Sequence, residues 1–155
     1  MAEYTSPLNA FGIKSFNSPG LGEKVSNLLH ISSAVIIPSN VRTVVTSGTT
    51  GYDENMCYPK DLAEEIMNAF ANVKAALQSA GVKDGFRSVY QMTSYHVTDF
   101  GDADMEAVDK AVEKYFGKNR PAWAGIGVAA LYGGARIEIT AWAALEPVTT
   151  ILPVL

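Results

Sequence analysis

Glu138 is the carboxylate whose position most strongly suggests chemistry, because it lies inside the strand-like run Arg136–Trp142 and not at its end. A carboxylate held partly out of water in a strand needs a compensating partner, and such residues recur at functional sites. Arg136, two residues earlier, could instead form an ordinary surface ion pair with Glu138, which is common on strands. The alternation of side chains alone leaves both interpretations open.

A turn that combines hydroxyl groups with glycines follows the β-branched run Val41–Ser47. It consists of Ser47, Gly48 and the sequence Thr-Thr-Gly. Glycines leave backbone N–H groups uncovered, so such a turn can hold an anion or the oxyanion of a reacting carbonyl. A glycine turn that only reverses the chain is at least as common. Ser47 and Gly48 are therefore candidate site residues with a plain structural alternative.

The sequence has two histidines, His30 and His96. His96 shares an expected strand face with Tyr90, Met92 and Ser94, and there it could act as a general base or as a hydrogen-bond donor. An isolated histidine in a strand is more often a structural residue. With only two histidines and no carboxylate at ligand spacing from them, the sequence argues against a metal site.

Cys57 is the single cysteine, which excludes an intrachain disulfide and a zinc site built from several cysteines. It precedes an expected helix, where a thiolate is favoured. No histidine lies near it in the sequence to act as a base, so a loop thiol without a catalytic task is the preferred interpretation.

Two amphipathic helices are expected to position these groups. Residues 59–80 carry apolar side chains at the three-and-four spacing of one helical face, with Pro59 suited to a first turn and Gly81 just past the end. The second helix should begin between Asp99 and Asp104, whose carboxylates favour a helix N-terminus, and it should end at Gly117.

Five segments rich in β-branched or aromatic residues predict strands. They span residues 28–38, 41–47, 88–98, 121–131 and 135–145. The first two strands are expected to form one hairpin, and the last two another across Tyr132-Gly133-Gly134. The order β-β-α-β-α-β-β predicts an α+β fold in which a mixed sheet carries both helices on one face.

The uncovered face of such a sheet must meet water or another chain. In the last strand one alternating set is apolar and suits a core under the helices; it comprises Ile137, Ile139, Ala141 and Ala143. The opposite set mixes polar and aromatic residues; it comprises Arg136, Glu138, Thr140 and Trp142. That mixture is unusual for a solvated face and reasonable for a subunit interface with a pocket, so we expect an oligomer.

A chain of 155 residues suits one domain. We expect an irregular N-terminal arm over residues 1–27, the domain over 28–145, and an apolar C-terminal tail over 146–155. The net charge of −4 and the dispersed Lys and Arg residues argue against nucleic acid and anionic membranes as partners. No apolar stretch approaches the roughly 20 residues of a membrane span, and no secretory leader is visible, so a cytoplasmic protein is expected.

Several segments together resemble the Rid family (YjgF/YER057c/UK114). They are Ser32-Ser33-Ala34-Val35 followed by 44–48, the helix residues Asn72, Leu77, Ala80 and Gly81, and Pro121-Ala122 followed by 127–131 and 135–139. The resemblance covers residues 28–145 and depends on the order and spacing of these motifs. It implies a chorismate-mutase-like fold assembled as a homotrimer with clefts between subunits.

The resemblance also implies a chemistry. Well-known family members hydrolyse reactive enamines and imines to 2-oxo acids and ammonia without a cofactor. In those members an arginine directly after the Pro-Ala pair binds the substrate carboxylate, a task suited to a bidentate guanidinium. Here that position is Trp123, and Ile31 stands where a tyrosine is frequent. Arg120 lies at an odd offset from Trp123, so it is not an obvious replacement.

Glu138 matches the glutamate of the family's cleft, and Ser47-Gly48 match its cleft turn. We therefore expect Glu138 and Ser47 to be catalytic: Glu138 would move a proton or orient a water molecule, and Ser47 would hold a carbonyl or oxyanion. The residues expected to bind the substrate are Trp123, Gly48, Ile31, Tyr95, Tyr90 and His96. Trp123 with Tyr95 or Tyr90 would form the wall of an apolar pocket.

The predicted function is cofactor-free proton-transfer chemistry on an enamine, imine or enol metabolite of a biosynthetic pathway. Hydrolysis, tautomerisation, dehydration and cyclisation all belong to that class. One alternative is a 2-iminobutanoate/2-iminopropanoate-type deaminase, and another is a non-catalytic ligand-binding or interaction protein. Nuclease activity is disfavoured, because phosphate contact needs clustered Lys and Arg residues.

Overall fold

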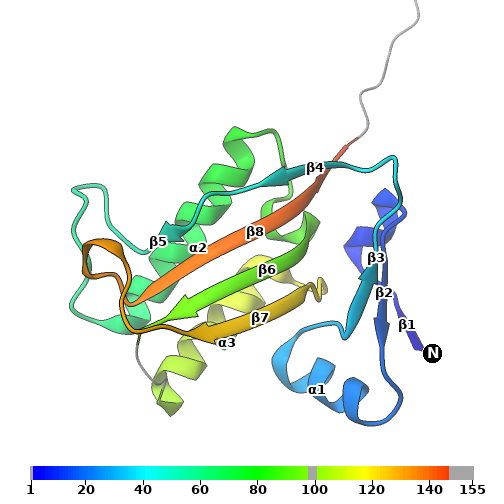
Figure 1. Cartoon of the computed structure of the whole chain (residues 1–155), viewed down its shortest axis with the longest axis horizontal. Coiled ribbons are helices and arrows are strands. Elements are labelled where there is room, and N and C mark those ends of the chain that lie inside the picture. The colour runs from blue at the N-terminus through cyan, green and yellow to red at the C-terminus, as the bar shows by residue number, and fades with distance from the viewer. Residues whose placement is uncertain (1, 98–100, 147–155) are drawn as a thin grey trace, which may run out of the picture.

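A computed structural model describes residues 2–97 and 101–146 and contains a five-stranded mixed sheet (Figure 1). Its strands are β4 (Arg42–Val45), β5 (Thr49–Thr50), β6 (Val89–His96), β7 (Ala122–Gly127) and β8 (Ile137–Leu145). The order is β4-β8-β6-β7, and β5 pairs with β8 further along the edge that β4 occupies. β6 and β7 are parallel, whereas β8 is antiparallel to β4, β5 and β6.

Helices α2 (Leu62–Ser79) and α3 (Asp102–Phe116) cover one face of this sheet and lie behind it in Figure 1. The predicted α+β architecture, with two helices on one face, is therefore confirmed. α2 begins later than predicted because Asp61 caps it: the Asp61 side chain accepts a hydrogen bond from the backbone N–H of Ala63 at 3.1 Å. Gly81 and Gly117, at φ +93° and +56°, end the two helices in conformations that glycine adopts without strain.

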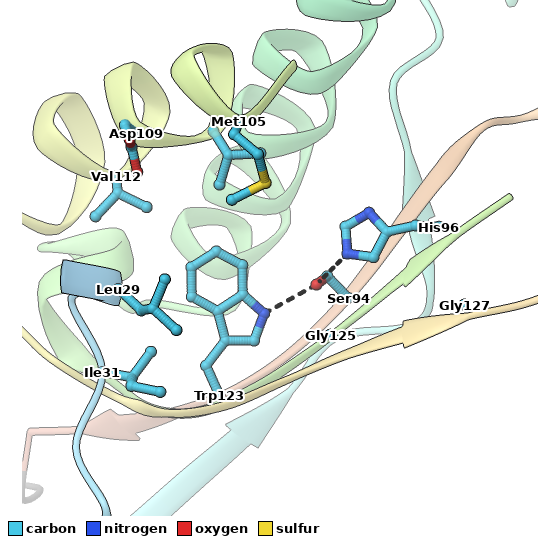
Figure 2. A pocket seen from close by; sticks show the side chains of 11 residues that line it. Leu29, Ile31, Ser94, His96, Met105, Asp109, Val112, Trp123, Gly125 and Gly127 are labelled. Carbon is cyan, nitrogen blue, oxygen red and sulfur yellow. Dashed lines mark hydrogen bonds between the residues drawn. The ribbon is translucent and has the colours of Figure 1, made fainter. Parts of the chain in front are cut away.

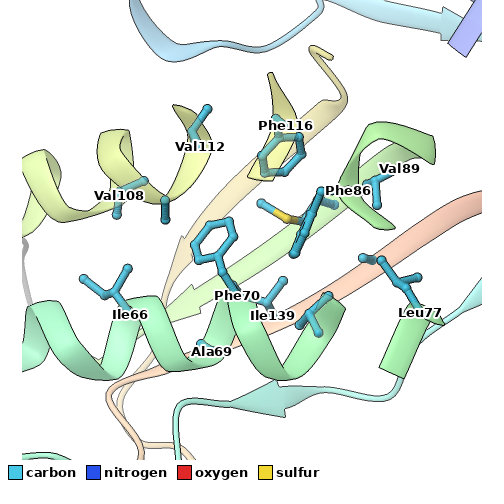
Figure 3. Packing of buried hydrophobic residues seen from close by; sticks show 14 of the residues in the cluster. Ile66, Ala69, Phe70, Leu77, Phe86, Val89, Val108, Val112, Phe116 and Ile139 are labelled. Carbon is cyan, nitrogen blue, oxygen red and sulfur yellow. The ribbon is translucent and has the colours of Figure 1, made fainter. Parts of the chain in front are cut away.

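The main core lies between the helices and the sheet. Phe70 from α2, Phe116 from α3 and Phe86 contact one another, with ring centroids 4.8 to 6.2 Å apart (Figure 3). β8 contributes the alternating set predicted for the core: Ile137, Ile139, Ala141 and Ala143 are all buried there. Burial of this apolar surface is the main driving force for assembling the helices on the sheet.

Both predicted hairpins are wrong. The strand after Ile31 is β3 (Ala34–Ile36), and it pairs with β2 (Lys14–Asn17), while β4 pairs with β8. The last two strands, β7 and β8, are both neighbours of β6 and do not pair with each other. Adjacency in the sequence favours a hairpin, but the parallel pairing of β6 with β7 through the α3 crossover takes precedence here.

The irregular structure predicted for residues 1–27 is also wrong. This region holds β1 (Ala2–Tyr4), the 3₁₀ helix η1 (Pro7–Phe11), β2 and most of α1 (Leu21–Leu29), and β1, β2 and β3 form a separate three-stranded antiparallel sheet. Leu8 and Ile13 are fully buried against Tyr90 and Ala144 of the larger sheet. A second small core therefore orders this region. The predicted C-terminal tail beyond Glu146 lies outside the described residues.

Candidate functional site

Strand alternation divides the predicted site residues between the two faces of the large sheet. On β6, Met92, Ser94 and His96 face the helices, because they pair with the buried residues Ala141, Ile139 and Ile137 of β8. Tyr95 pairs with Glu138, so these two side chains lie on the uncovered face. The groups that the sequence suggested for one site therefore form two clusters within a single chain.

The first cluster lines a cavity of about 360 Å³ between α3 and β7 (Figure 2). Its apolar walls come from Leu29, Ile31, Met105, Val108 and Val112, and its polar side chains are Ser94, His96, Asp109 and Trp123. β7 explains the space: it presents Trp123, Gly125 and Gly127 to the helix side, and the two glycines leave the volume of two side chains empty.

A hydrogen-bonded chain crosses the floor of this cavity. The Trp123 indole N–H donates to Ser94 Oγ at 2.9 Å, and Ser94 Oγ lies 2.8 Å from His96 Nε2. Figure 2 shows the Ser94 oxygen between the indole nitrogen and the imidazole ring. Desolvation by burial lowers the pKa of His96, which favours the neutral imidazole.

Trp123 is anchored in the core and lines the cavity at the same time. Its ring stacks on Phe116 at 11° and meets Phe70 edge-on at 72°. Ile31 is held beside it because the next residue, Ser32, donates from its backbone N–H to Pro121 O at 3.0 Å. Trp123, Ile31 and His96 are thus the predicted substrate-binding residues that the structure brings together.

The two predicted tyrosines lie elsewhere. Tyr95 occupies the uncovered face opposite Glu138. An irregularity in the pairing of β6 between Val89 and Gln91 turns Tyr90 away from the main core and toward Leu8 in the small N-terminal core. Burial raises the pKa of Tyr90, and a hydrogen bond with Thr43 offsets part of that effect. Neither tyrosine lines the α3/β7 cavity.

The second cluster lies on the uncovered face and consists of Glu138, Gly48, Ser47 and Tyr95. Glu138 is half-buried, and a side chain on Gly48 would collide with its carboxylate, so this close approach requires glycine. Ser47 is exposed, and its carbonyl accepts a hydrogen bond from Thr49 Oγ1 at 3.0 Å. The turn therefore brings the uncovered backbone of Gly48 beside the carboxylate.

Arg136 does not pair with Glu138, contrary to the simple surface alternative. Its guanidinium Nε lies 2.6 Å from Oε2 of Glu65, a fully buried residue of α2, and its backbone N–H donates to Oε1 at 2.7 Å. The guanidinium also donates to the carbonyls of Pro59 and Lys60. This buried pair fixes the start of β8 against the start of α2 and leaves Glu138 available for other contacts.

The position of β5 and its turn also depends on α2. Asn72, one of the motif residues in the sequence, donates from Nδ2 to the carbonyls of Thr50 and Tyr52, both at 3.0 Å. The Thr50 hydroxyl is hydrogen-bonded to Tyr58 at 2.9 Å. These contacts hold the turn that carries Gly48 at the level of Glu138.

Sequence reasoning missed several residues of the cavity. From the sequence, Ser94 stands out only as a neighbour of His96, and no site role is predicted for Gly125, Gly127, Met105 or Asp109. A usable signal was present: Trp123, Gly125 and Gly127 recur at every second position of one strand, which predicts a gap on one face. Arg120, as expected, is no replacement for an arginine at Trp123, because it donates to Ser26 and Asn27 of α1.

Two general searches complete the description of residues 2–97 and 101–146. No group of three or more His, Cys, Asp or Glu side chains in these ranges is arranged to hold a metal ion. None of the helices there is long and apolar enough to cross a bilayer. Cys57 is exposed in the loop between β5 and α2.

Comparison with known proteins identifies relatives of this chain. A family model described as Endoribonuclease L-PSP matches residues 27–145. The 2-iminobutanoate/2-iminopropanoate deaminase of Rattus norvegicus is 37% identical over 123 residues, which cover 77% of this chain and 82% of the relative. The Homo sapiens protein of the same name is 36% identical over 121 residues, with the same coverage.

A solved structure matches as well. The crystal structure of YyfB from Yersinia pestis, described as a protein of unknown function of the conserved Rid family, superposes with a TM-score of 0.72 at 27% identity. The match covers 86% of this chain and 98% of that one.

Proposed function

This chain belongs to the Rid family, described by its family model as Endoribonuclease L-PSP, and from that premise we propose that it is a cofactor-free enzyme of the imine-deaminase kind. Its reaction is proton-transfer chemistry on an enamine, imine or enol metabolite of a biosynthetic pathway in the cytoplasm. The observation that carries the proposal is the half-buried Glu138 carboxylate, which lies against the backbone of Gly48.

In the hydrolytic form of this chemistry, Glu138 takes a proton from the attacking water molecule. The water oxygen bonds to the imine carbon as the C=N π electrons move to nitrogen, which gains the proton and gives a neutral carbinolamine. The carbinolamine hydroxyl proton then passes through Glu138 to nitrogen, the C–N bond breaks, and ammonia leaves while the oxygen forms the carbonyl group. Ser47 and the backbone N–H of Gly48 stabilise the carbinolamine oxygen as it loses its proton. A positioned acid–base group of this kind contributes roughly 10²–10⁴-fold to a rate.

The substrate differs from a simple 2-imino acid in this proposal. The resemblance places a carboxylate-binding arginine at the position of Trp123, and hydrogen bonds to a charged group contribute about 1.5–3 kcal/mol. Here Trp123 and Ile31 line an apolar cavity instead. We therefore propose that the substrate is larger than the small 2-imino acids named for the relatives and has little or no carboxylate character.

A homotrimer completes the proposal, because Glu138 and the cavity lie on opposite faces of one sheet. The uncovered face exposes apolar side chains, with Val45 at 59% and Ile126 at 42% exposure. These lie on the same face as the half-buried residues Tyr95 and Glu138. Such a face suits contact with another subunit, and a cleft between subunits would combine the cavity of one chain with Glu138 of the next.

The test is Glu138→Gln, compared with wild type on freshly generated imines of several amines and amino acids, with ammonia release as the readout. The variant keeps the size of the side chain and removes its proton-accepting group, so turnover of any accepted imine should fall by about 100-fold or more. Glu113→Gln, at an exposed position of α3, is the matched control and should keep wild-type turnover. Unchanged turnover in Glu138→Gln would remove the proposed role.

A ligand-binding protein without catalysis is the second candidate, favoured by the separation of the cavity from Glu138 within one chain. Mass spectrometry of small molecules that copurify with the protein separates the two. A bound apolar molecule, together with no ammonia from any imine, would support binding alone. Ammonia release that depends on Glu138 would exclude it.

A further inference from the structure

The α3/β7 cavity has a polar end formed by Trp123, Ser94 and His96. An indole N–H can only donate, so Ser94 Oγ is the acceptor in its contact with Trp123 at 2.9 Å. Ser94 Oγ also lies 2.8 Å from His96 Nε2, and either atom can be the donor in that contact. In both cases the serine oxygen keeps one position, a lone pair or its proton, for a further hydrogen bond. Burial lowers the pKa of His96, which favours the neutral imidazole. Ser94 is fully buried, so its two partners hold its orientation.

Gly125 makes this polar end reachable. An atom at the position of a Cβ on Gly125 would lie 3.6 Å from His96 Nε2 and 3.7 Å from Ser94 Oγ, which are ordinary contact distances. The backbone of Gly125 has no positive φ, so the space results from the missing side chain and not from a strained turn. A ligand atom in this position would contact both polar groups without displacing any protein atom.

The charge of the cavity excludes one class of ligand. Among the described residues that line it, Asp109 is the single charged side chain, and neither Lys nor Arg is present. A carboxylate would lose its hydration there without gaining a cationic partner, and it would share the cavity with the negative charge of Asp109. The apolar walls of Leu29, Ile31 and Met105 favour a hydrocarbon body instead.

From these observations we propose that the cavity binds the apolar part of the substrate, and that this substrate carries no carboxylate and places one neutral hydrogen-bonding heteroatom over Gly125, against His96 and Ser94. The inference depends on the proposed function only in treating the ligand as a substrate. The binding site itself depends on the cavity geometry. An amine-derived imine or its enamine has this character, so the reaction that supplies it would oxidise an amine rather than an amino acid.

Three probes with one common body test the proposal: indole-3-ethanol, 3-ethylindole and indole-3-acetate. Binding is followed by calorimetry and by the indole N–H resonance of Trp123 in ¹⁵N-labelled protein, identified with the Trp142→Phe variant. Indole-3-ethanol should bind best and shift that resonance. 3-Ethylindole should bind about 2- to 10-fold more weakly, because it lacks one hydrogen bond. Indole-3-acetate should bind at least 10-fold more weakly than indole-3-ethanol.

Two glycine variants locate the heteroatom. Gly125→Ala places a methyl group where the heteroatom is expected and should weaken indole-3-ethanol at least 10-fold, with a smaller effect on 3-ethylindole. Gly127→Ala adds the same methyl group where no atom lies within 4 Å, so it only reduces the cavity volume. It should weaken the binding of both probes to the same extent, and by less than Gly125→Ala weakens the binding of indole-3-ethanol. Asp109→Asn should reduce the difference in binding affinity between indole-3-acetate and indole-3-ethanol.

The outcomes separate this inference from the proposed function. Equal binding of indole-3-acetate and indole-3-ethanol, equal effects of the two glycine variants, or an unmoved Trp123 resonance would each overturn the binding site. If the probes bind in the expected order but no imine is turned over, the proposed binding site is supported and the proposed catalytic function is wrong. If small 2-imino acids are turned over rapidly and Glu138→Gln loses that turnover, the proposed catalytic function is supported and the proposed carboxylate-free substrate is wrong.

Discussion

The two faces of the large sheet use the same strands for different purposes. The helix-covered face carries Ile139, Ala141 and Met92, and it continues into the Trp123 cavity. The uncovered face carries Glu138 and Tyr95 beside the exposed Val45. Adjacent residues of β8 therefore lie in different surroundings, whereas residues far apart in the sequence can share one face.

This difference shows where stability and function can separate. The covered face must be filled with apolar side chains, because the sheet and the helices are held together there. The uncovered face contributes little to that core, so it can keep a carboxylate, hydroxyl groups and apolar side chains for a second chain or a ligand. The cavity, where β7 has two glycines, brings a polar cluster with Ser94 and His96 into the covered face.

The largest expected effect comes from substituting two adjacent residues of β8 that face opposite sides. Ile139→Ala removes a fully buried side chain, and such a change costs about 2–5 kcal/mol of unfolding free energy. Thr140→Ala, on the uncovered face, should change it by about 0.5 kcal/mol or less. Urea denaturation at one fixed protein concentration measures both; equal losses would mean that the uncovered face is also part of the folded core.

The next test addresses the assembly. Val45→Asp places a charge on the exposed apolar part of the uncovered face and should convert the proposed trimer to monomers, measured by light scattering after size exclusion. Circular dichroism should stay unchanged, because Val45 lies outside the core. Ala71→Asp, an exposed position on α2, is the control and should keep the trimer mass. A Val45→Asp trimer would show that subunits meet elsewhere.

The smallest expected effect is on the pH dependence of stability. Burial lowers the pKa of His96 below its ordinary value of 6.5. As the pH falls through that value, the unfolded chain takes up a proton before the folded chain, so the free energy of unfolding decreases until the pH reaches the lower folded-state pKa. His96→Gln removes this contribution. Its unfolding free energy should therefore decrease less on acidification than that of the wild type, and equal slopes would contradict a buried neutral His96.

Local signals in the sequence were sufficient for several features. The apolar spacing of α2, the glycines after both helices and the alternation in β8 all appear in the structure as predicted. Each depends on residues within a few positions of one another, where capping and side-chain periodicity act directly.

Features that need distant partners were missed. Residues 2–29 are ordered by contacts such as Leu8 with Tyr90, which no local pattern indicates. Arg136 was expected to face outward with Glu138, but it reaches Glu65, 71 positions earlier. Tyr90 left its expected face because the β6 pairing is irregular beside it, and one shifted residue exchanges the two sides of a strand.

The sequence by itself determined the family, the helices and the face on which each β8 side chain lies, because these depend on residue type and short-range periodicity. Only the tertiary structure decided that Glu138 and Trp123 are separated by the thickness of the sheet, and that Trp123, Ser94 and His96 share one cavity. The reason is strand pairing: placing β7 parallel beside β6 brings Trp123 within 2.9 Å of a serine 29 positions away, and no local pattern specifies that neighbour.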